Sequence, residues 1–420
     1  PPTHPPHPSP STRYAHKLTT VWLVTGGVDD TRGLSYYQKG WTSFEYRLAL
    51  MIKIANDAHA SSWPQLLDLQ YAAGDTRRVQ FSKLPPAEPL AFCEGHTYGE
   101  KVYTSGADRD AIVAPKFKEA TFQLLGGVEE LSFEKNRWGD DEMRSIAAVL
   151  PLCGKLRSLD LAINGFGPES ARVLAAATGR GALAQVETLS LRGNRIAAEG
   201  AVALAEAIGA GALLKLQWLD LVGNGIGDVG LEALAKASLA EGALSALTRL
   251  SLNYANKLTP RGIGALAEAG RGGAMKALKT LEVGENKTIC DEGAQLMAGA
   301  LKAGAFPSCI GLSFMDCGLS DTGVAALAAS RDGLSSFMMG HVALGDCSAL
   351  AAALSGGALP VLSQLWLAES TISDAGCAAL AAALDGGAVP RLQTLNMGAA
   401  RKDDPVLKAA CAKREDVDLK

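Results

Sequence analysis

The chain of 420 residues has a formal net charge of -4, and 48% of its residues are hydrophobic while 20% are charged. This composition excludes a disordered chain, and the charge is not that of a nucleic-acid-binding domain or of a protein held on an anionic membrane surface. No apolar run reaches the length of a transmembrane helix, so direct insertion into a membrane is not expected.

A Pro-rich tail occupies residues 1–16. Proline removes a backbone donor and fixes φ, so this segment can form neither a helix nor a core of its own. We expect the tail to be held against a partner or against the body of the protein. Because the sequence begins without Met, we expect either a processed chain or a fragment of a longer product.

Residues 17–120 lack the period that organises the rest of the chain and predict a small α/β region. Thr20–Val24 is an apolar, β-branched run that predicts a buried strand, and Leu66–Leu69 predicts a second strand. Between them, Ser43 is a suitable N-cap for a helix whose apolar residues recur at helical spacing from Phe44. Strand, loop and helix together form an α/β unit.

The segment after the first predicted strand resembles the second half of Toll/interleukin-1 receptor (TIR) domains. There a strand leads to a Trp-Cys-x-x-Glu motif at a helix start, and here Trp41 and Glu45 stand at the matching positions with Thr42 in place of Cys. The resemblance covers residues 20–55. Because this Glu is catalytic in the NAD-cleaving members, the resemblance implies Glu45 as a catalytic carboxylate and Trp41 as the motif tryptophan.

The first half of a TIR domain is missing from this sequence, since fewer than 20 residues precede the first predicted strand. Without that half, no wall would hold a nicotinamide ring against Glu45. The alternative is structural: Trp41 packs, and Glu45 lies in the first helical turn, where the helix dipole favours an acid. We therefore predict no enzymatic activity, no cofactor and no metal, with NAD cleavage as the alternative.

Residues 121–402 repeat one pattern about ten times. Clear copies are Leu189-Ser-Leu-Arg-Gly-Asn194 and Leu219-Asp-Leu-Val-Gly-Asn224, each followed by an Ala- and Leu-rich segment with helical spacing. Successive Asn positions are 25 to 32 residues apart, which is typical of a solenoid. Leu-x-Leu places two apolar side chains on one face of a short strand, and the units must stack to bury that face.

The residue that follows each predicted strand is expected to close a tight bend. Its side chain can hydrogen-bond backbone groups that would otherwise be buried without partners. This structural role is predicted for Asn164, Asn194, Asn224, Asn256, Asn286 and Cys317. After the repeats, residues 403–420 predict a C-terminal cap, with a last helix and a short edge strand at Val417–Leu419.

Over residues 125–420 this pattern resembles the leucine-rich repeat family, and specifically its ribonuclease-inhibitor-like class with long repeats and a full helix in each. The resemblance implies an α/β fold, in which a curved solenoid has a parallel sheet on its concave side and helices outside. Family members mostly bind other proteins and rarely catalyse reactions. The join between the Tyr- and Trp-containing region and the repeats is similar in style to large protist and algal proteins.

The strand positions that flank the leucines point out of the concave face. Trp218 and Trp366 stand out there because Trp and Arg dominate binding hot spots, although each could instead lie flat on a neighbouring strand as sheet packing. We predict partner contacts at Arg192, Trp218, Asp220, Arg249, Asn253, Glu282, Met315 and Trp366.

Two steps depart from the common period: the 32-residue step that ends at Asn256 and the 25-residue step that ends at Val342. The short step must lose part of its helix or loop, which changes the local curvature. Irregular units of this kind are either contact sites or tolerated drift.

The eight cysteines are scattered, without a Cys-x-x-Cys pair or a Cys/His cluster at zinc spacing. Cys317 takes an Asn position, and Cys290, Cys347 and Cys377 fall near predicted helix starts. We interpret these four as small buried hydrophobic residues, with a buried disulfide as the alternative. Reduced thiols fit a cytoplasmic or other reducing intracellular compartment, or an organelle if the chain is processed.

The sequence contains no nucleophile elbow, P-loop, dinucleotide fingerprint or zinc-protease motif. It therefore predicts a non-catalytic scaffold whose rigid curved surface binds protein partners, as a structural or accessory subunit of a large multi-subunit complex. The alternatives are a TIR-like NAD-cleaving signalling enzyme that uses Glu45, and a fragment of an immune-type or regulatory receptor-like sensor.

Overall fold

The computed structural model describes residues 21–23, 66–68, 125–254, 256–414 and 417–420. Strands β1 (Val21–Leu23) and β2 (Leu66–Asp68) pair in parallel, at the two positions where the sequence predicts strands. The Pro-rich tail, Ser43 and the TIR-like residues Trp41 and Glu45 lie outside the described ranges. The hypotheses that rest on them stay predictions.

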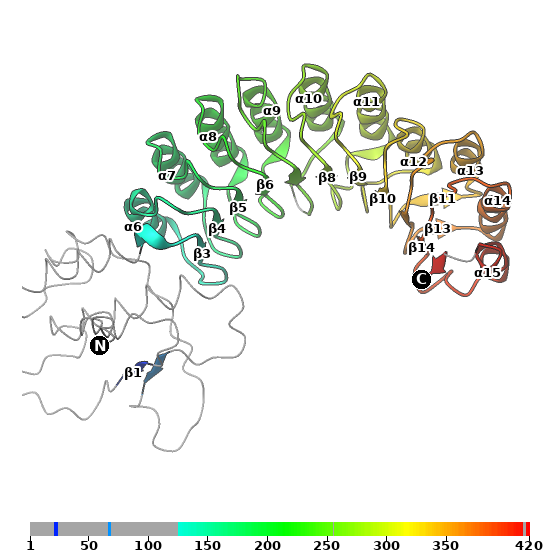
Figure 1. Cartoon of the computed structure of the whole chain (residues 1–420), viewed down its shortest axis with the longest axis horizontal. Coiled ribbons are helices and arrows are strands. Elements are labelled where there is room, and N and C mark those ends of the chain that lie inside the picture. The colour runs from blue at the N-terminus through cyan, green and yellow to red at the C-terminus, as the bar shows by residue number, and fades with distance from the viewer. Residues whose placement is uncertain (1–20, 24–65, 69–124, 255, 415–416) are drawn as a thin grey trace, which may run out of the picture.

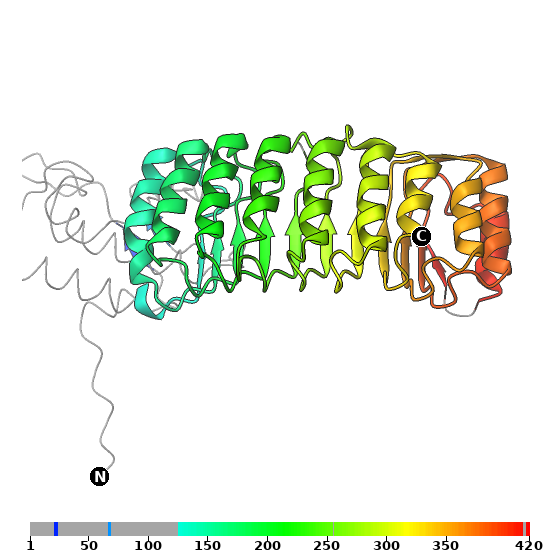
Figure 2. The same cartoon turned by 90° about the horizontal axis from the view of Figure 1, so that it is seen from above.

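From Leu125 onward the chain forms a curved leucine-rich-repeat solenoid, as the sequence predicts. It is an arch whose helices lie along the outer side and whose strands line the inner side (Figure 1). Within the described residues, eleven strands form one parallel sheet in the order β3-β4-β5-β6-β7-β8-β9-β10-β12-β14-β15. The helices lie next to one another in a single row above the sheet (Figure 2).

The strands are short and regularly spaced. Those of the long sheet are β3 (Glu130–Ser132), β4 (Ser158–Asp160), β5 (Thr188–Ser190), β6 (Trp218–Asp220), β7 (Arg249–Ser251), β8 (Thr280–Glu282), β9 (Gly311–Ser313), β10 (Ser336–Met338), β12 (Gln364–Trp366), β14 (Thr394–Asn396) and β15 (Asp418–Leu419). β11 (Ala343–Gly345) and β13 (Thr371–Ile372) form a separate parallel pair.

One helix follows each strand of the long sheet from β3 to β14. These helices are α6 (Asp140–Val149, extended by the 3-10 helix η4, Leu150–Leu152), α7 (Pro168–Gly179), α8 (Ala197–Gly209), α9 (Gly227–Ala237), α10 (Pro260–Arg271), α11 (Cys290–Lys302), α12 (Asp321–Ala328), α13 (Ser348–Ser355), α14 (Asp374–Asp385) and α15 (Pro405–Ala412).

The core is a continuous layer between the sheet and the helices. The strands pair residue by residue, so that Leu189, Leu219 and Leu250 form one ladder of side chains within the core, between the sheet and the helices. These three leucines are at most 4% exposed. The helices approach closely, since a Cβ placed on Gly230 of α9 would lie 2.7 Å from the Cβ of Ala201 in α8.

The Asn that follows each of the strands β4 to β8 joins consecutive repeats. In the buried Asn224, Nδ2 donates to the carbonyl oxygens of Leu221 at 3.1 Å and Val222 at 3.3 Å, and across the repeat boundary to that of Leu191 at 2.9 Å. Its Oδ1 accepts from the backbone N–H of Ile196 at 3.4 Å. At Cys317, where the sequence has no amide, Sγ lies 3.3 Å from the carbonyl oxygen of Val283.

Carboxylates at several helix starts cap the next helix in the row. Asp228 of α9 accepts hydrogen bonds from the backbone N–H of Thr259 at 2.9 Å and of Gly262 at 3.2 Å, both at the start of α10. Asp291 of α11 accepts in the same way from the N–H of Ser320 at 2.8 Å, just before α12. These bonds lock neighbouring helices in register along the row.

The 25-residue step shortens a helix, as its length predicts. α12 and α13 have 8 residues each, whereas α11 has 13. In the same units the pair β11 and β13 replaces part of the Asn network, and Ser370 Oγ accepts from the backbone N–H of Val342 at 3.3 Å.

All seven described cysteines are free, which contradicts the disulfide alternative for them; Cys93 lies outside the described residues. Cys317, Cys347 and Cys377 are buried as predicted, but the prediction is wrong for Cys290. As the first residue of α11, Cys290 is only half-buried. Burial raises the pKa of Cys317 and Cys347 to about 12. Within the described part of the chain, no helix combines the length and the apolarity needed to cross a membrane.

Candidate functional site

The concave face of the sheet carries three rows of side chains. The first residues of the strands make one row, which includes Trp218 and Arg249, and the third residues make the middle row. The positions two residues further on make a third row, which includes Arg192, Asn253, Gly284, Met315 and Gly340. Because the strand register is regular, residues of one row lie next to one another on neighbouring strands.

The middle row alternates between serine and an acid from β3 to β9. In strand order it reads Ser132, Asp160, Ser190, Asp220, Ser251, Glu282 and Ser313. Each carboxylate therefore has a hydroxyl group on both sides, and consecutive carboxylates are two strands apart, about 10 Å. Like charges directly opposite would destabilise the sheet, so this spacing allows three acids in one row.

Four residues of the central strands form a closed network. Arg249 Nη2 lies 2.7 Å from Glu282 Oε1, and Ser251 Oγ donates to Glu282 Oε2 at 2.7 Å. Trp218 Nε1 donates to Ser251 Oγ at 3.4 Å, and Arg249 Cζ lies 4.8 Å from the centre of the Trp218 ring. Trp218 is thus held by its neighbours on β7.

Asp220 lies next to this network and differs from Glu282 in its hydrogen bonding. It is 5% exposed, and its Oδ1 accepts from the backbone N–H of Val222 at 3.0 Å. No described residue donates a hydrogen bond to its Oδ2. Burial raises the pKa of the Asp220 carboxyl; Glu282 raises it further, while the Val222 bond, Arg192 and Arg249 act in the opposite direction.

The concave face carries apolar side chains around β10. A Cβ placed on Gly340 would lie 3.4 Å from Met315 Cε and 3.5 Å from Trp366 Cδ1, so both side chains lie beside this glycine. Met338 is half-buried in the middle row between Ser313 and Trp366. Trp366 is 38% exposed. We call Met315, Met338 and Trp366 the apolar patch.

The structure brings several of the predicted contact residues together. Trp218, Arg249 and Glu282 share one network, with Asp220 beside it, and Met315 and Trp366 share the patch. Arg192 is exposed, and Asn253 Oδ1 accepts from the backbone N–H of Gly284 at 2.6 Å. The sequence pattern placed Ser251, Met338 and Gly340 on the concave face, but they were not among the predicted contact residues. The alternation of serine and acid in the aligned repeats was a signal for Ser251, whereas Gly340 had none.

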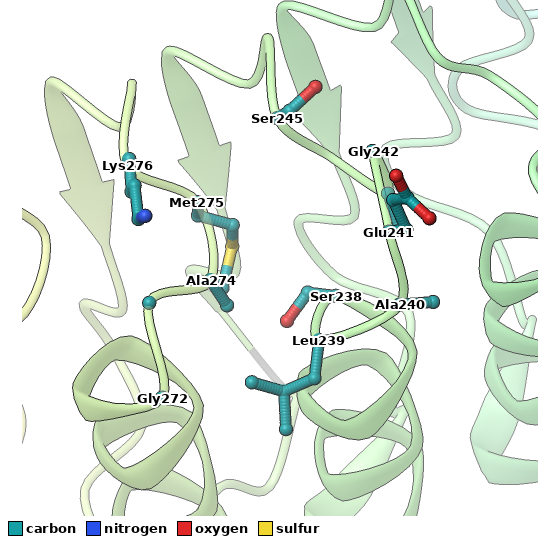
Figure 3. Close-up of a pocket in the computed structure, with 12 residues that line it drawn as sticks. Ser238, Leu239, Ala240, Glu241, Gly242, Ser245, Gly272, Ala274, Met275 and Lys276 are labelled. Atoms are coloured by element: carbon teal, nitrogen blue, oxygen red, sulfur yellow. The ribbon is translucent and has the colours of Figure 1, made fainter.

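A pocket of about 270 Å³ lies away from the concave face, between the segments that follow α9 and α10. Figure 3 shows Leu239 pointing into the gap between the two helix ends, with Glu241 and Lys276 on opposite sides. None of the eight predicted contact residues lines it. Within the described part of the chain, no cluster of His, Cys, Asp or Glu could hold a metal ion.

Comparisons with known proteins agree with the repeat architecture. A family model described as Leucine Rich repeat matches residues 186–205 and 213–235, which contain β5, β6 and most of α8 and α9. No curated protein matches the chain. Among solved structures, the chain is similar to one in the "Crystal structure of Rad7 and Elc1 complex in yeast", with 16% identity, a TM-score of 0.40 and coverage of 66% of this chain and 72% of that chain.

Proposed function

We propose that this leucine-rich-repeat array is a non-catalytic scaffold that binds protein partners on its concave face. The observation that carries the proposal is the inner side of the arch, where no helix of the described repeats lies, since all of these helices are on the outer side (Figure 1). The inner side presents an exposed Trp366, the charged Arg192 and Arg249, and the buried Asp220, whose Oδ2 accepts no hydrogen bond from a described residue. Trp and Arg are the residues that most often dominate protein interfaces.

The shape of the array supports this function. A sheet whose strands pair residue by residue, backed by a row of helices, loses little conformational freedom when a partner docks. The eight predicted contact residues remain our candidates for the interface. We further propose that the array belongs to the ribonuclease-inhibitor-like class, because its full helices reach 13 residues, and that the protein is a subunit of a larger assembly.

The experiment compares, in one pull-down, a substitution on the concave face with a substitution on the helical outer side. The tagged full chain is incubated with native extract, and bound proteins are quantified by mass spectrometry for the wild type, Trp366→Ala and Leu296→Ala. Leu296 is the matched control because it lies on α11 with a similar exposure, 40% against 38% for Trp366. We expect Trp366→Ala to reduce partner recovery about tenfold and Leu296→Ala to leave it unchanged.

Two results would contradict the proposal. If no protein from the native extract is enriched over an unrelated tagged control protein, the proposal that the chain is a scaffold is contradicted. If partners are recovered equally with Trp366→Ala and with the double variant Trp218→Ala/Trp366→Ala, the concave face is not the binding face.

A further inference from the structure

Three carboxylates share the middle row, and among the described residues only Asp220 has no side chain as a hydrogen-bond or ion-pair partner. Glu282 is paired with Arg249 and Ser251. Asp160 is half-buried; its Oδ1 accepts a local bond from the backbone N–H of Ala162 at 3.0 Å, and its Oδ2 accepts from Ser132 Oγ at 3.5 Å. Asp220 is the most deeply buried carboxylate of the row, and within the described part of the chain its only hydrogen bond is the local one from Val222. Burial of a charge without a partner costs free energy, so Asp220 is a site that an incoming cation would stabilise.

The neighbours of Asp220 do not supply that cation. Arg192 and Arg249 act on it only at longer range, since neither forms a salt bridge with it among the described residues. Arg249 is already engaged by Glu282 and by the ring of Trp218. Ser190 and Ser251 flank Asp220 on the adjacent strands and carry hydroxyl groups that can contact the same ligand.

The apolar patch lies further along the same face and offers a second contact. From β6 to β12 the sheet order makes five strand steps, which corresponds to about 24 Å at the usual strand spacing. An extended peptide covers this distance in about seven residues. A continuous protein segment can therefore reach Asp220 and the patch at once.

We infer that the partner is a protein segment that presents a Lys or Arg side chain to Asp220 and an apolar side chain to Met315, Met338 and Trp366. The inference rests on the proposed function and specifies the chemistry of the occupant. Charge complementarity selects this occupant, because an acidic segment or a nucleic acid would bring like charges against Asp160, Asp220 and Glu282.

The test selects peptides without assuming a partner. A phage library of random 16-residue peptides is panned against the full chain, and enriched sequences are compared with the unselected library. We expect enrichment of Lys or Arg together with an aromatic or aliphatic residue about seven positions away. A library without enriched sequences, or one enriched in Asp and Glu, would overturn the inference.

A selected peptide is then synthesised and titrated by fluorescence anisotropy. We expect Asp220→Asn and Trp366→Ala each to weaken binding about tenfold, because each removes one of the two contacts. The matched controls are Glu199→Gln, the same kind of change on the exposed side of α8, and Leu296→Ala. Both are expected to bind within about twofold of the wild type.

A double-mutant cycle isolates the charge contact. Replacing the peptide's basic residue by Met should weaken binding to the wild type, but should have little further effect on Asp220→Asn. Additive losses would contradict contact between the two groups.

Thermal melts of the two concave-face variants, Asp220→Asn and Trp366→Ala, check that both are folded. Peptides that are acidic or neutral but still depend on Trp366 would refute this inference and leave the proposed function standing. Peptide binding that neither Asp220→Asn nor Trp366→Ala weakens would count against both this inference and the proposed function.

Discussion

At the scale of the residue, Asn224 holds a turn of the solenoid together. Its amide donates to three buried backbone carbonyls in two repeats. We expect Asn224→Ala to lower the free energy of unfolding by about 3 kcal/mol, because these acceptors lose their donors. Urea denaturation measures the loss. Gln217→Ala is the control, since among the described residues the side-chain amide of Gln217 bonds only Glu187, in an exposed contact. An equal effect of both variants would contradict the role of Asn224.

Asp220 gives a prediction about pH dependence. Burial raises the pKa of the Asp220 carboxyl in the folded state above its value in the unfolded chain, so the folded state binds this proton more tightly. The folded state therefore loses stability as the pH rises from the unfolded-state pKa through the folded-state pKa. We expect Asp220→Asn to be at least as stable as the wild type at pH 7, with a smaller difference at about pH 4. Thermal melts at both pH values test this. A less stable variant at pH 7 would show that Asp220 is satisfied within the fold.

The cysteines should differ in reactivity. Thiolate is the reactive form, and burial raises the pKa of Cys153, Cys317 and Cys347 to about 12. We expect iodoacetamide at about pH 8 to leave these three unmodified in the native protein and to modify them after unfolding in urea. The half-buried Cys290 is expected to react first among the described cysteines. Peptide mass mapping on a Cys93→Ser background resolves each site, and early labelling of Cys317 would contradict the packing.

At the scale of the element, the close approach of helices decides which glycines are essential. Alanine favours a helix over glycine by about 1 kcal/mol, yet the Cβ of Gly230→Ala would press on Ala201 at 2.7 Å. We expect a net loss of about 2 kcal/mol in the free energy of unfolding. In Gly209→Ala the nearest atom lies at 3.5 Å, so this control in α8 should be neutral or stabilising. Equal effects in chemical denaturation would rule out the packing explanation.

At the scale of the whole molecule, each repeat is stable only because a neighbour covers its apolar face. At the C-terminal end, β15 pairs with β14, which carries the buried Leu395, and α15 packs against α14. We expect removal of residues 403–420 to expose this edge and to cause self-association. Light scattering after size exclusion measures the mass. The control Val406→Ser changes an exposed residue of α15 and should stay monomeric, while a monomeric, equally stable truncation would contradict the capping role.

The repeat pattern alone was sufficient to predict the solenoid and its strands. Leu-x-Leu followed by Asn located the strands around Leu159, Leu189, Leu219 and Leu250, and the structure has a strand at each. This succeeded because alternation along a strand and the bend after it depend on residues that are close in sequence. The same pattern identified which side chains lie on the concave face.

Only the tertiary structure decided what those side chains do. Asp220 and Glu282 occupy equivalent positions in their repeats, yet among the described residues only Glu282 has side-chain partners, because Arg249 and Ser251 of β7 both turn to Glu282. Likewise, only stacking brings Met315 and Trp366 together over Gly340. These contacts join residues about one or two repeats apart, whose side-chain directions depend on packing across the sheet rather than on local sequence.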